Sequence, residues 1–482
     1  ALLFLAYGYY GPLLDQLGLS LIAHRGYPIE RLVATLYMTL EGVFGVPLDV
    51  AATYIVLFVI YGAILEHSGA GRFFVDWAMA AIGRSGGGAG PGRTVAVAGY
   101  LLGCVSGSGV ANTVTLGAIA WPMLRRAGYT PEIGGAVLAA AGIGAILAPP
   151  AMGAAAFLIA EFLGISFLEV MMMAAIPAAL YYGSILMMIE AEARRLRTRT
   201  VDVEPGTLGR LTRRYGYHFV SLFSLAFFLI RGMTAVRAVF WSTLLAFALS
   251  FVRSETALWP KRLVAALAGA GRSVVPVVAT TAVAGIIVGV VTLTGLGLKV
   301  SGVIVTLAGG SLALTVIYAA IAVWVLGLAV PVTASYIIAA VMIAPALVQV
   351  GVPPAAAHMF IFYYAVLSEV SPPTALSPFA AAALTGADPM RTTLHTWKYT
   401  LPAFVVPFMW TLSERGRGLL LPAPWPDALV AVTLAVVCLA CFAAGTCGWI
   451  RREANVLERA GMIVAGVLFL SGSTPAVAIA VA

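Results

Sequence analysis

Small side chains with oxygen atoms gather at the front of an apolar stretch that runs from Gly103 to Phe157. The stretch opens with GCVSGSGVANTVTLG and closes with ILAPPAMGAAAF. Its oxygen-bearing residues are Ser106, Ser108, Asn112, Thr113 and Thr115. Hard cations such as sodium prefer oxygen ligands, and glycines such as Gly107 and Gly109 let backbone carbonyls approach a solute. The pattern predicts a site for a cation or a small polar solute.

A second group of oxygen-bearing side chains lies late in the chain. It comprises Thr333 and Ser335 after Pro331, and Ser368, Glu369, Ser371 and Thr374 around Pro372-Pro373. An acid beside a helix break in a membrane interior is a functional candidate, so Glu369 is predicted to bind a cation or carry a proton. The alternative is that its carboxylate reaches the interface or caps a helix amide. No Lys or Arg lies between Thr94 and Leu124, so an anion there would depend on helix dipoles and hydroxyl groups.

Both groups belong to one duplicated unit. A single constant offset carries Ala111 to Ala334, Pro122 to Pro345, Gly128 to Gly351, Pro131 to Pro354 and Pro149-Pro150 to Pro372-Pro373. Each double proline removes two amide donors and disrupts the helix before it. Paired interruptions in two halves of a membrane chain point to a transporter's binding site. The alternative is that the small and hydroxyl-bearing residues only let helices pack closely.

The composition excludes an ordinary soluble protein. Of the 482 residues, 61% are hydrophobic and only 10% are charged, and the mean hydropathy is +0.99. These values are typical of a polytopic membrane protein. The net charge of +8 comes from Lys and Arg in short loops, which indicates topology and not nucleic-acid binding. The four cysteines lie in apolar surroundings and are expected to be buried structural thiols.

Segments long enough to cross a bilayer recur along the chain. They are expected near residues 1–14 (partial), 47–66, 133–163, 166–189, 215–231, 233–252, 273–293, 354–384, 401–420, 424–448 and 460–480. Two further runs, 94–124 and 312–350, are bent at Ser106 to Gly109 and at Pro331, which predicts re-entrant hairpins. Shorter amphipathic pieces are expected along the interface at 29–43, 71–84, 260–270, 297–308 and 388–399.

The predicted fold is an all-α polytopic membrane protein with two inverted repeats, each with a re-entrant hairpin and a broken helix. The expected parts are a residual N-terminal helix and interfacial arm (1–46), repeat I (47–190, hairpin 94–124, broken helix 133–163), a cytoplasmic linker (191–214), repeat II (215–400, hairpin 312–350, broken helix 354–384) and C-terminal membrane helices (401–482). The opening residues resemble the second half of a spanning helix, so upstream sequence is expected to be missing.

Charge sets the expected orientation. Placing the arginine-rich linker inside also places the loops near 67–98, 125–132, 253–272, 388–400 and 449–459 inside, and with them most of the 28 Lys and Arg residues. The first hairpin would then enter from the cytoplasm and the second from the opposite side. The basic linker is interpreted as a topology signal, with lipid-headgroup contact as the alternative.

Enzyme motifs give no support for catalysis. The segment Gly83-Arg84-Ser85-Gly86-Gly87 fits GxSxG, but it lies in a glycine-rich loop without the strand-to-helix turn that a nucleophile elbow requires. The sequence contains no HExxH, no phosphate loop and no GxGxxG that opens a nucleotide fold. We therefore expect no enzyme activity, no cofactor, no resident metal and no ATP-driven transport within this chain.

The motifs resemble the membrane component of TRAP (tripartite ATP-independent periplasmic) transporters. They are most similar to the TAXI branch, in which the small and large membrane subunits are fused, and the likeness runs from about Tyr7 to the C-terminus. Its most specific segments are TLEGVFGVPL, SGAGRFFVDWAMAAIGR, SGSGVANTVTLG, PPAMGAAAFLIAEFLG, PVTASYIIAA and GVPPAAAHMFIFYYAVLSEVSPPTALSPFAAAALTGADPM.

The resemblance implies an elevator mechanism in a bacterial or archaeal cytoplasmic (inner) membrane. It implies sodium as the coupling ion, a periplasmic substrate-binding protein, small-membrane-subunit helices and a small organic anion, such as a dicarboxylate, as substrate. The implied cation-binding residues are Ser106, Gly107, Asn112, Ala148, Val330, Thr333, Ser368, Glu369, Ser371 and Thr374. The implied substrate-binding residues are Ser108, Gly109, Asn112, Thr115, Pro149, Pro150, Thr333, Pro372, Pro373 and Thr374.

The chain departs from the family pattern in three places. Family members usually carry polar residues, including a glutamine, before the first double proline, whereas this chain has only apolar residues from Gly142 to Leu147. They usually carry asparagine or an apolar residue where this chain has Glu369. The helices of the small subunit are missing apart from a possible remnant. The titratable Glu369 leaves a proton-coupled or mixed mechanism open.

Three other functions are also compatible with the sequence. An elevator symporter or exchanger that works without a binding protein, with protons coupled through Glu369, is the alternative within transport. An intramembrane enzyme would need a nucleophile and base at one depth, and Glu369 has no evident basic partner in the sequence. A scaffold would leave transport unchanged when Asn112 or Glu369 is substituted.

Overall fold

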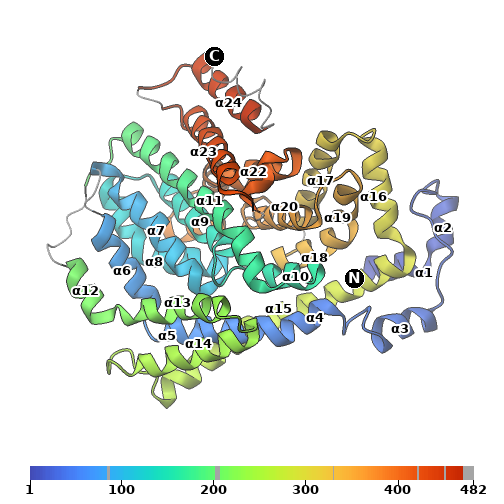
Figure 1. The fold of residues 1–482 in the computed structure, drawn as a ribbon, viewed down its shortest axis with the longest axis horizontal. Helices are drawn as coiled ribbons and strands as arrows, with labels where there is room; N and C mark the ends of the chain where they lie inside the picture. The colour runs from blue at the N-terminus through green and yellow to red at the C-terminus, as the bar shows by residue number, and fades with distance from the viewer. Residues whose placement is uncertain (84–86, 201–206, 329, 421–422, 450–451, 471–482) are drawn as a thin grey trace. The chain divides into compact units, whose positions relative to one another are not determined.

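The computed structural model describes the chain except for residues 84–86, 201–206, 329, 421–422, 450–451 and 471–482. The described residues form helices and no strand, apart from one isolated bridge between Trp449 and Glu453 (Figure 1). Within the described ranges, four helices are long and apolar enough to cross a membrane, namely Val46–His67, Phe167–Leu196, Pro260–Thr294 and Trp425–Cys447. The predicted all-α class is confirmed.

The chain divides into two compact units, and the divisions fall at both helix breaks. Unit 1 holds residues 1–57, 154–167 and 270–368, and unit 2 holds residues 58–153, 168–269 and 369–482. Each unit therefore combines the hairpin of one sequence repeat with the second half of the broken helix from the other repeat. Sequence order alone did not predict this exchange.

Unit 1 is built around α20 (Pro354–Val366), the first half of the second broken helix. Nearly all of its side chains are buried, because α10, α17, α18 and α19 pack against it. The other helices of this unit are α1 (Leu2–Tyr9), α2 (Gly11–Gln16), α3 (Ile29–Met38), α4 (Val46–Val50), a π-helical turn (Ala51–Ile55), α10 (Ala155–Leu163), most of α15 (Pro260–Thr294), α16 (Leu296–Leu307), α17 (Leu312–Gly327), α18 (Val332–Met342) and α19 (Ala344–Gln349).

Unit 2 is built around α9 (Pro131–Leu147), which is the equivalent half of the first broken helix. Every residue from Ile133 to Leu147 is buried, since α7, α8, α21 and α22 surround α9 (Figure 1). The remaining helices of this unit are most of α5 (Val56–His67), α6 (Ala70–Ile82), α7 (Gly90–Ser106), α8 (Gly109–Ala127), α11 (Phe167–Leu196), α12 (Thr207–Tyr215), α13 (Tyr217–Ile230), α14 (Ala235–Ser250), α21 (Leu376–Thr385), α22 (Pro389–Leu412), α23 (Trp425–Cys447) and α24 (Val456–Leu470), with short 3₁₀ turns at Gly87–Ala89 and Arg415–Leu419. A further 3₁₀ turn, Leu367–Val370, contains the division between the units.

Both hairpins form where the sequence bends. In the first, α7 ends at Ser106 and α8 begins at Gly109, with Gly107 in the left-handed conformation at φ 58°. In the second, α17 ends at Gly327 and α18 begins after Pro331. Asp388 caps the following helix α22 by accepting a bond from the Arg391 amide at 2.7 Å, and Pro389 follows it at the first position of that helix.

Two predicted divisions between interfacial and spanning segments are wrong. Residues 260–270 and 273–293 form the single helix α15, and residues 388–399 continue into α22. Hydropathy falls where charged residues begin, but helix hydrogen bonding continues through them, and Gly269 and Gly271 are tolerated inside α15. In the same way α11 continues to Leu196, so the predicted linker begins inside a helix.

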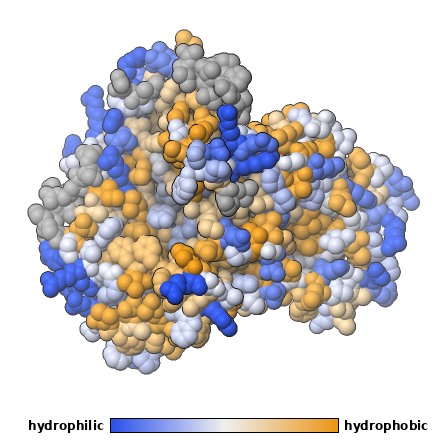
Figure 2. Space-filling model, in the orientation of Figure 1, coloured by the Kyte–Doolittle hydropathy of each residue, from blue (hydrophilic) through white to orange (hydrophobic). Residues whose placement is uncertain are grey.

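Large apolar side chains cover much of the surface, as expected for a chain that faces lipid. Phe223, Phe227 and Ile230 on α13 and Phe240 and Trp241 on α14 are exposed. Figure 2 shows hydrophobic residues over much of the visible face, with hydrophilic residues in separate groups. Because a water-exposed surface of this kind would associate, the arrangement supports a membrane environment.

Candidate functional site

The tip of the first hairpin lies against the first helix break. A Cβ atom at Gly107 would stand 2.2 Å from the carbonyl oxygen of Met152, so only glycine fits. Met152 itself has φ 54°, a left-handed conformation that is strained for a residue with a side chain. The side chains of Ser106 and Ser108 are exposed on this tip. Strain of this kind clusters at functional sites.

Asn112 presents a buried amide oxygen behind the tip. Its side chain is 2% exposed, and Nδ2 donates to the carbonyls of Gly99 at 2.9 Å and Gly142 at 3.3 Å. Oδ1 has no hydrogen-bond partner among the described residues. A buried acceptor without a donor costs about 1–3 kcal/mol. The oxygen is therefore available to a cation or to a hydrogen-bond donor on a solute.

Glu369 lies in the same unit, against the first turn of α8. A Cβ atom at Gly109 would stand 2.4 Å from Glu369 Oε2, and the hydroxyl of Ser377 donates to this oxygen at 3.1 Å. Among the described residues no Lys, Arg or His nitrogen lies within 4.0 Å of the half-buried carboxylate. The partial positive charge of the α8 N-terminus favours the carboxylate. The prediction that Glu369 stands beside a helix break is confirmed, whereas its role in binding stays a prediction.

Unit 1 repeats part of this geometry with different side chains. The repeat offset places Ser335 at the position of Asn112, and Ser335 is fully buried with no partner for Oγ among the described residues. A Cβ atom at Gly327 would lie 3.4 Å from Ser335 Oγ and 2.9 Å from Ser368 Cβ. The close approach of hairpin and broken helix is thus present in both repeats.

The predicted residues divide between the two units. Unit 2 holds Ser106, Gly107, Ser108, Gly109, Asn112, Thr115, Ala148, Pro149, Pro150, Glu369, Ser371, Pro372, Pro373 and Thr374, and unit 1 holds Val330, Thr333 and Ser368. Pro149 and Pro372 each precede a cis peptide bond, and the Pro149 carbonyl accepts a bond from Cys104 Sγ at 3.0 Å. Thr374 Oγ1 donates to the Ser371 carbonyl at 3.3 Å.

Sequence reasoning missed Ser377, and it placed Ser335 in the second group of oxygen-bearing residues without assigning it to the cation or the substrate. Ser377 lies about one helical turn after the second double proline. Its spacing from Glu369 across that break was the sequence feature that could have identified it. Ser335 was visible as the repeat equivalent of Asn112. His358 is hydrogen-bonded through Nδ1 to the Tyr336 hydroxyl at 2.8 Å. The serine of the GxSxG segment, Ser85, lies outside the described residues.

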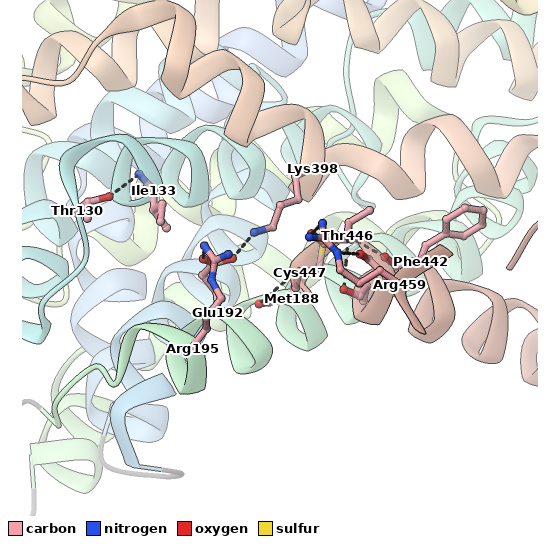
Figure 3. A network of polar contacts seen from close by, with 12 residues as sticks. Thr130, Ile133, Met188, Glu192, Arg195, Lys398, Phe442, Thr446, Cys447 and Arg459 are labelled. Atoms are coloured by element: carbon pink, nitrogen blue, oxygen red, sulfur yellow. Dashed lines mark hydrogen bonds and ion pairs between the residues drawn. The ribbon is translucent and has the colours of Figure 1, made fainter. Parts of the chain in front are cut away.

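A second polar network joins α11 to α22 in unit 2. Glu192 is fully buried and accepts from Arg195 at 2.6 Å and from Lys398. Figure 3 shows Lys398 pointing from α22 toward Glu192, with Arg195 beside the same carboxylate. The two cations compensate the buried charge of Glu192, so we interpret this cluster as a structural contact that holds α11 against α22.

Solved and curated proteins support the fold. The YdaH transporter of Alcanivorax borkumensis has a similar structure, with a TM-score of 0.54 at 16% identity over 85% of this chain and 96% of that protein. The 2,3-diketo-L-gulonate TRAP transporter large permease protein YiaN of Escherichia coli is 32% identical over 131 residues, which are 27% of this chain and 30% of YiaN. The C4-dicarboxylate TRAP transporter large permease protein DctM of Rhodobacter capsulatus is 32% identical over 95 residues, 20% of this chain and 21% of that protein.

The match to a family extends much further than these local similarities. A sequence model of the tripartite ATP-independent periplasmic transporter, DctM component, matches residues 1–414. This range contains both hairpins, both broken helices and every predicted site residue. The chain belongs to the DctM component family of tripartite ATP-independent periplasmic transporters.

Proposed function

We propose that the chain is the membrane component of a TAXI-type secondary transporter that imports a small organic anion by sodium symport with an elevator motion. A periplasmic substrate-binding protein delivers the anion, and the helices of a small membrane subunit complete the membrane part. The location is a bacterial or archaeal inner membrane. A dicarboxylate or related acid is the proposed substrate, since relatives of this chain are named for such acids.

The observation that carries the proposal is the amide oxygen of Asn112 behind the first hairpin tip, which has no hydrogen-bond partner in the part of the chain that the structure describes. Oδ1 is buried beside a strained break, and hydroxyls of Ser106 and Ser108 are exposed at the tip. Asn112 Oδ1, to which no described group donates, and hydroxyl oxygens are of the type that suits a hard cation. Helix N-termini and hydroxyls suit a carboxylate, and no Lys or Arg belongs to the hairpin between Thr94 and Leu124.

Uptake into proteoliposomes tests this function. The full membrane component is reconstituted with its cognate binding protein and a labelled dicarboxylate outside, and an inward sodium gradient is compared with an inward proton gradient. We expect sodium-dependent uptake that Asn112→Ala lowers at least tenfold. Thr94→Ala is the matched control, because Thr94 is also buried in the hairpin but donates to its own helix at the Gly90 carbonyl. Equal uptake by both variants would contradict the role of Asn112.

Proton coupling through Glu369 is the second candidate function. It is favoured by the contact of Glu369 with Gly109 and Ser377 and by the lack of a cationic partner among the described residues. If uptake follows the proton gradient and Glu369→Gln abolishes it, while exposed Glu161→Gln does not, protons replace sodium as the coupling ion. Uptake without any binding protein would favour a transporter that takes the solute directly from the medium.

A further inference from the structure

A cavity of about 470 Å³ opens beside the last turns of α8, away from the hairpin tip. It is lined by Trp121, Pro122, Arg125 and Arg126. Trp121 and Arg125 are one helical turn apart, as are Pro122 and Arg126, so two adjacent rows of side chains face the cavity. The cavity belongs to unit 2 alone.

The indole of Trp121 is fixed in place by the neighbouring helix. A Cβ atom at Gly134 on α9 would stand 2.5 Å from Trp121 Cζ3, so the ring lies directly on the backbone of that helix. Trp121 is half-buried, whereas Pro122, Arg125 and Arg126 are exposed. The cavity thus has one rigid aromatic wall and a rim that carries two positive charges.

The guanidinium groups at the rim have no carboxylate partner. Neither Arg125 nor Arg126 forms an ion pair within the part of the chain that the structure describes. Arg93, which is near the start of the same hairpin, is by contrast bound to Glu190. Two unpaired guanidinium groups beside a cavity favour an anion, and planar guanidinium groups match phosphate oxygens bidentately.

The second sequence repeat shows that a hairpin of this kind packs without a tryptophan and two arginines at these positions. The constant offset carries Trp121, Pro122, Arg125 and Arg126 to Ala344, Pro345, Val348 and Gln349. The second copy keeps the proline and lacks the indole and both charges. A preference for positive charge on the cytoplasmic side explains the sign of Arg125 and Arg126. It does not explain a fixed tryptophan one turn before them on the wall of a cavity.

We propose that this cavity binds a phosphate-bearing anion, with the phosphate on Arg125 and Arg126 and the glycerol part of the ligand against Trp121. Two sources share this chemistry, the headgroup of an anionic phospholipid and a soluble phosphate ester. Tryptophan is enriched at the headgroup level of membranes, and basic pockets beside spanning helices suit anionic headgroups. The site is separate from the hairpin tip and does not depend on the transported solute.

Native mass spectrometry of the full protein tests the proposal. The protein is purified in detergent and exposed to phosphatidylglycerol, to phosphatidylcholine of the same chain length, and to glycerol 3-phosphate in separate arms. We expect retention of phosphatidylglycerol that is roughly 30-fold weaker in Arg125→Gln/Arg126→Gln. Each basic side chain near the membrane surface strengthens binding of an anionic lipid by roughly fivefold, and the two factors multiply. The control Arg210→Gln/Arg213→Gln removes two exposed charges from α12 and should leave this retention unchanged.

The arms separate the two sources. Arginine-dependent retention of phosphatidylglycerol supports a lipid ligand, and arginine-dependent binding of glycerol 3-phosphate alone supports a soluble one. Quenching of tryptophan fluorescence by phosphatidylglycerol with brominated acyl chains gives a second readout. The quenched part of the fluorescence should be smaller in Trp121→Phe. Binding that is equal in the wild type and Arg125→Gln/Arg126→Gln, or lost equally in the α12 control, would overturn the proposal.

Discussion

Glu192 and Glu369 are carboxylates in the same unit that are stabilised in different ways. Glu192 has no exposed surface and is bound by two cations, Lys398 and Arg195. Glu369 has a serine hydroxyl and the N-terminal end of α8 beside it, and no cationic partner among the described residues. Because two cations compensate the Glu192 charge, this residue holds α11 against α22, whereas the binding of a cation or proton by Glu369 stays a prediction.

Substitution of Lys398 should destabilise the protein strongly. Lys398→Met leaves Glu192 with Arg195 alone, and loss of one partner from a buried ion pair typically costs about 3–5 kcal/mol. Thermal unfolding of the detergent-solubilised protein measures the change. Arg214→Gln is the matched control, since its pair with Glu255 is 49% and 47% exposed and should contribute about 0–1 kcal/mol.

The double variant separates charge from packing. Glu192→Leu/Lys398→Met removes both charges of the pair, so it should be less destabilising than Lys398→Met alone. If the double variant unfolds at a lower temperature than Lys398→Met, the buried charge of Glu192 is not the cause of the destabilisation in Lys398→Met.

At the scale of elements, glycines set the distance between each hairpin and its broken helix. A Cβ atom at Gly99 would lie 2.8 Å from the Ala141 carbonyl oxygen, and one at Gly103 would lie 2.6 Å from Ala145 Cα. These glycines are one turn apart on α7. Gly107, one turn further along, has a different role, because it turns the chain at the hairpin tip. Gly285 and Gly289 on α15 likewise lie against the backbone of Gly42 and Glu41.

Gly103→Ala should therefore disturb the hairpin. The new methyl group would meet backbone atoms of α9 that cannot rotate away, and overpacking of this kind costs typically about 1–3 kcal/mol. Gly183→Ala on α11 is the control, because its Cβ meets nothing within 4 Å. Thermal unfolding should show a lower midpoint for Gly103→Ala only. Equal midpoints for the two variants would mean that α7 and α9 separate without cost.

At the scale of the whole molecule, the loops predicted to share the cytoplasmic side contact one another within unit 2. The amide of Arg199 donates to the Ala127 carbonyl at 2.9 Å, and the Thr198 hydroxyl donates to the Gly88 carbonyl at 2.9 Å. Arg262 donates to the His67 carbonyl at 3.1 Å, and Arg214 is paired with Glu255. Loops that meet in this way lie on one side of a membrane, which agrees with their predicted placement on a common side, and the cytoplasmic identity of that side stays a prediction.

Cysteine labelling from each side of the membrane checks this orientation. The native cysteines are all buried, so an impermeant maleimide should report only introduced sites. We expect exposed Ser254→Cys to react in inside-out vesicles and exposed Ser166→Cys to react in intact cells. The same side of labelling for both would exclude a crossing by α11, α13 and α14 in the predicted order.

The sequence by itself determined the membrane class, the duplicated unit and the positions of both hairpins and both breaks. These features depend on local rules, because prolines remove amide donors, glycine adopts the left-handed turn at Gly107, and apolar composition selects the bilayer. The family resemblance also followed from short motifs, and the match over residues 1–414 confirms it. Helix ends were less predictable, as α15 and α22 show, because backbone hydrogen bonding continues where hydropathy changes.

Only the tertiary structure decided which half-helices pack together and which polar groups stay unpaired. The exchange of α10 and α21 between the repeats is a matter of long-range packing, and no local pattern encodes it. The contact of Glu369 with Gly109, the unpaired oxygen of Asn112 and the tie at Glu192 depend on segments far apart in the chain. The residue type determines what a side chain can bind. Whether that side chain is available for binding depends on the neighbours that folding brings to it.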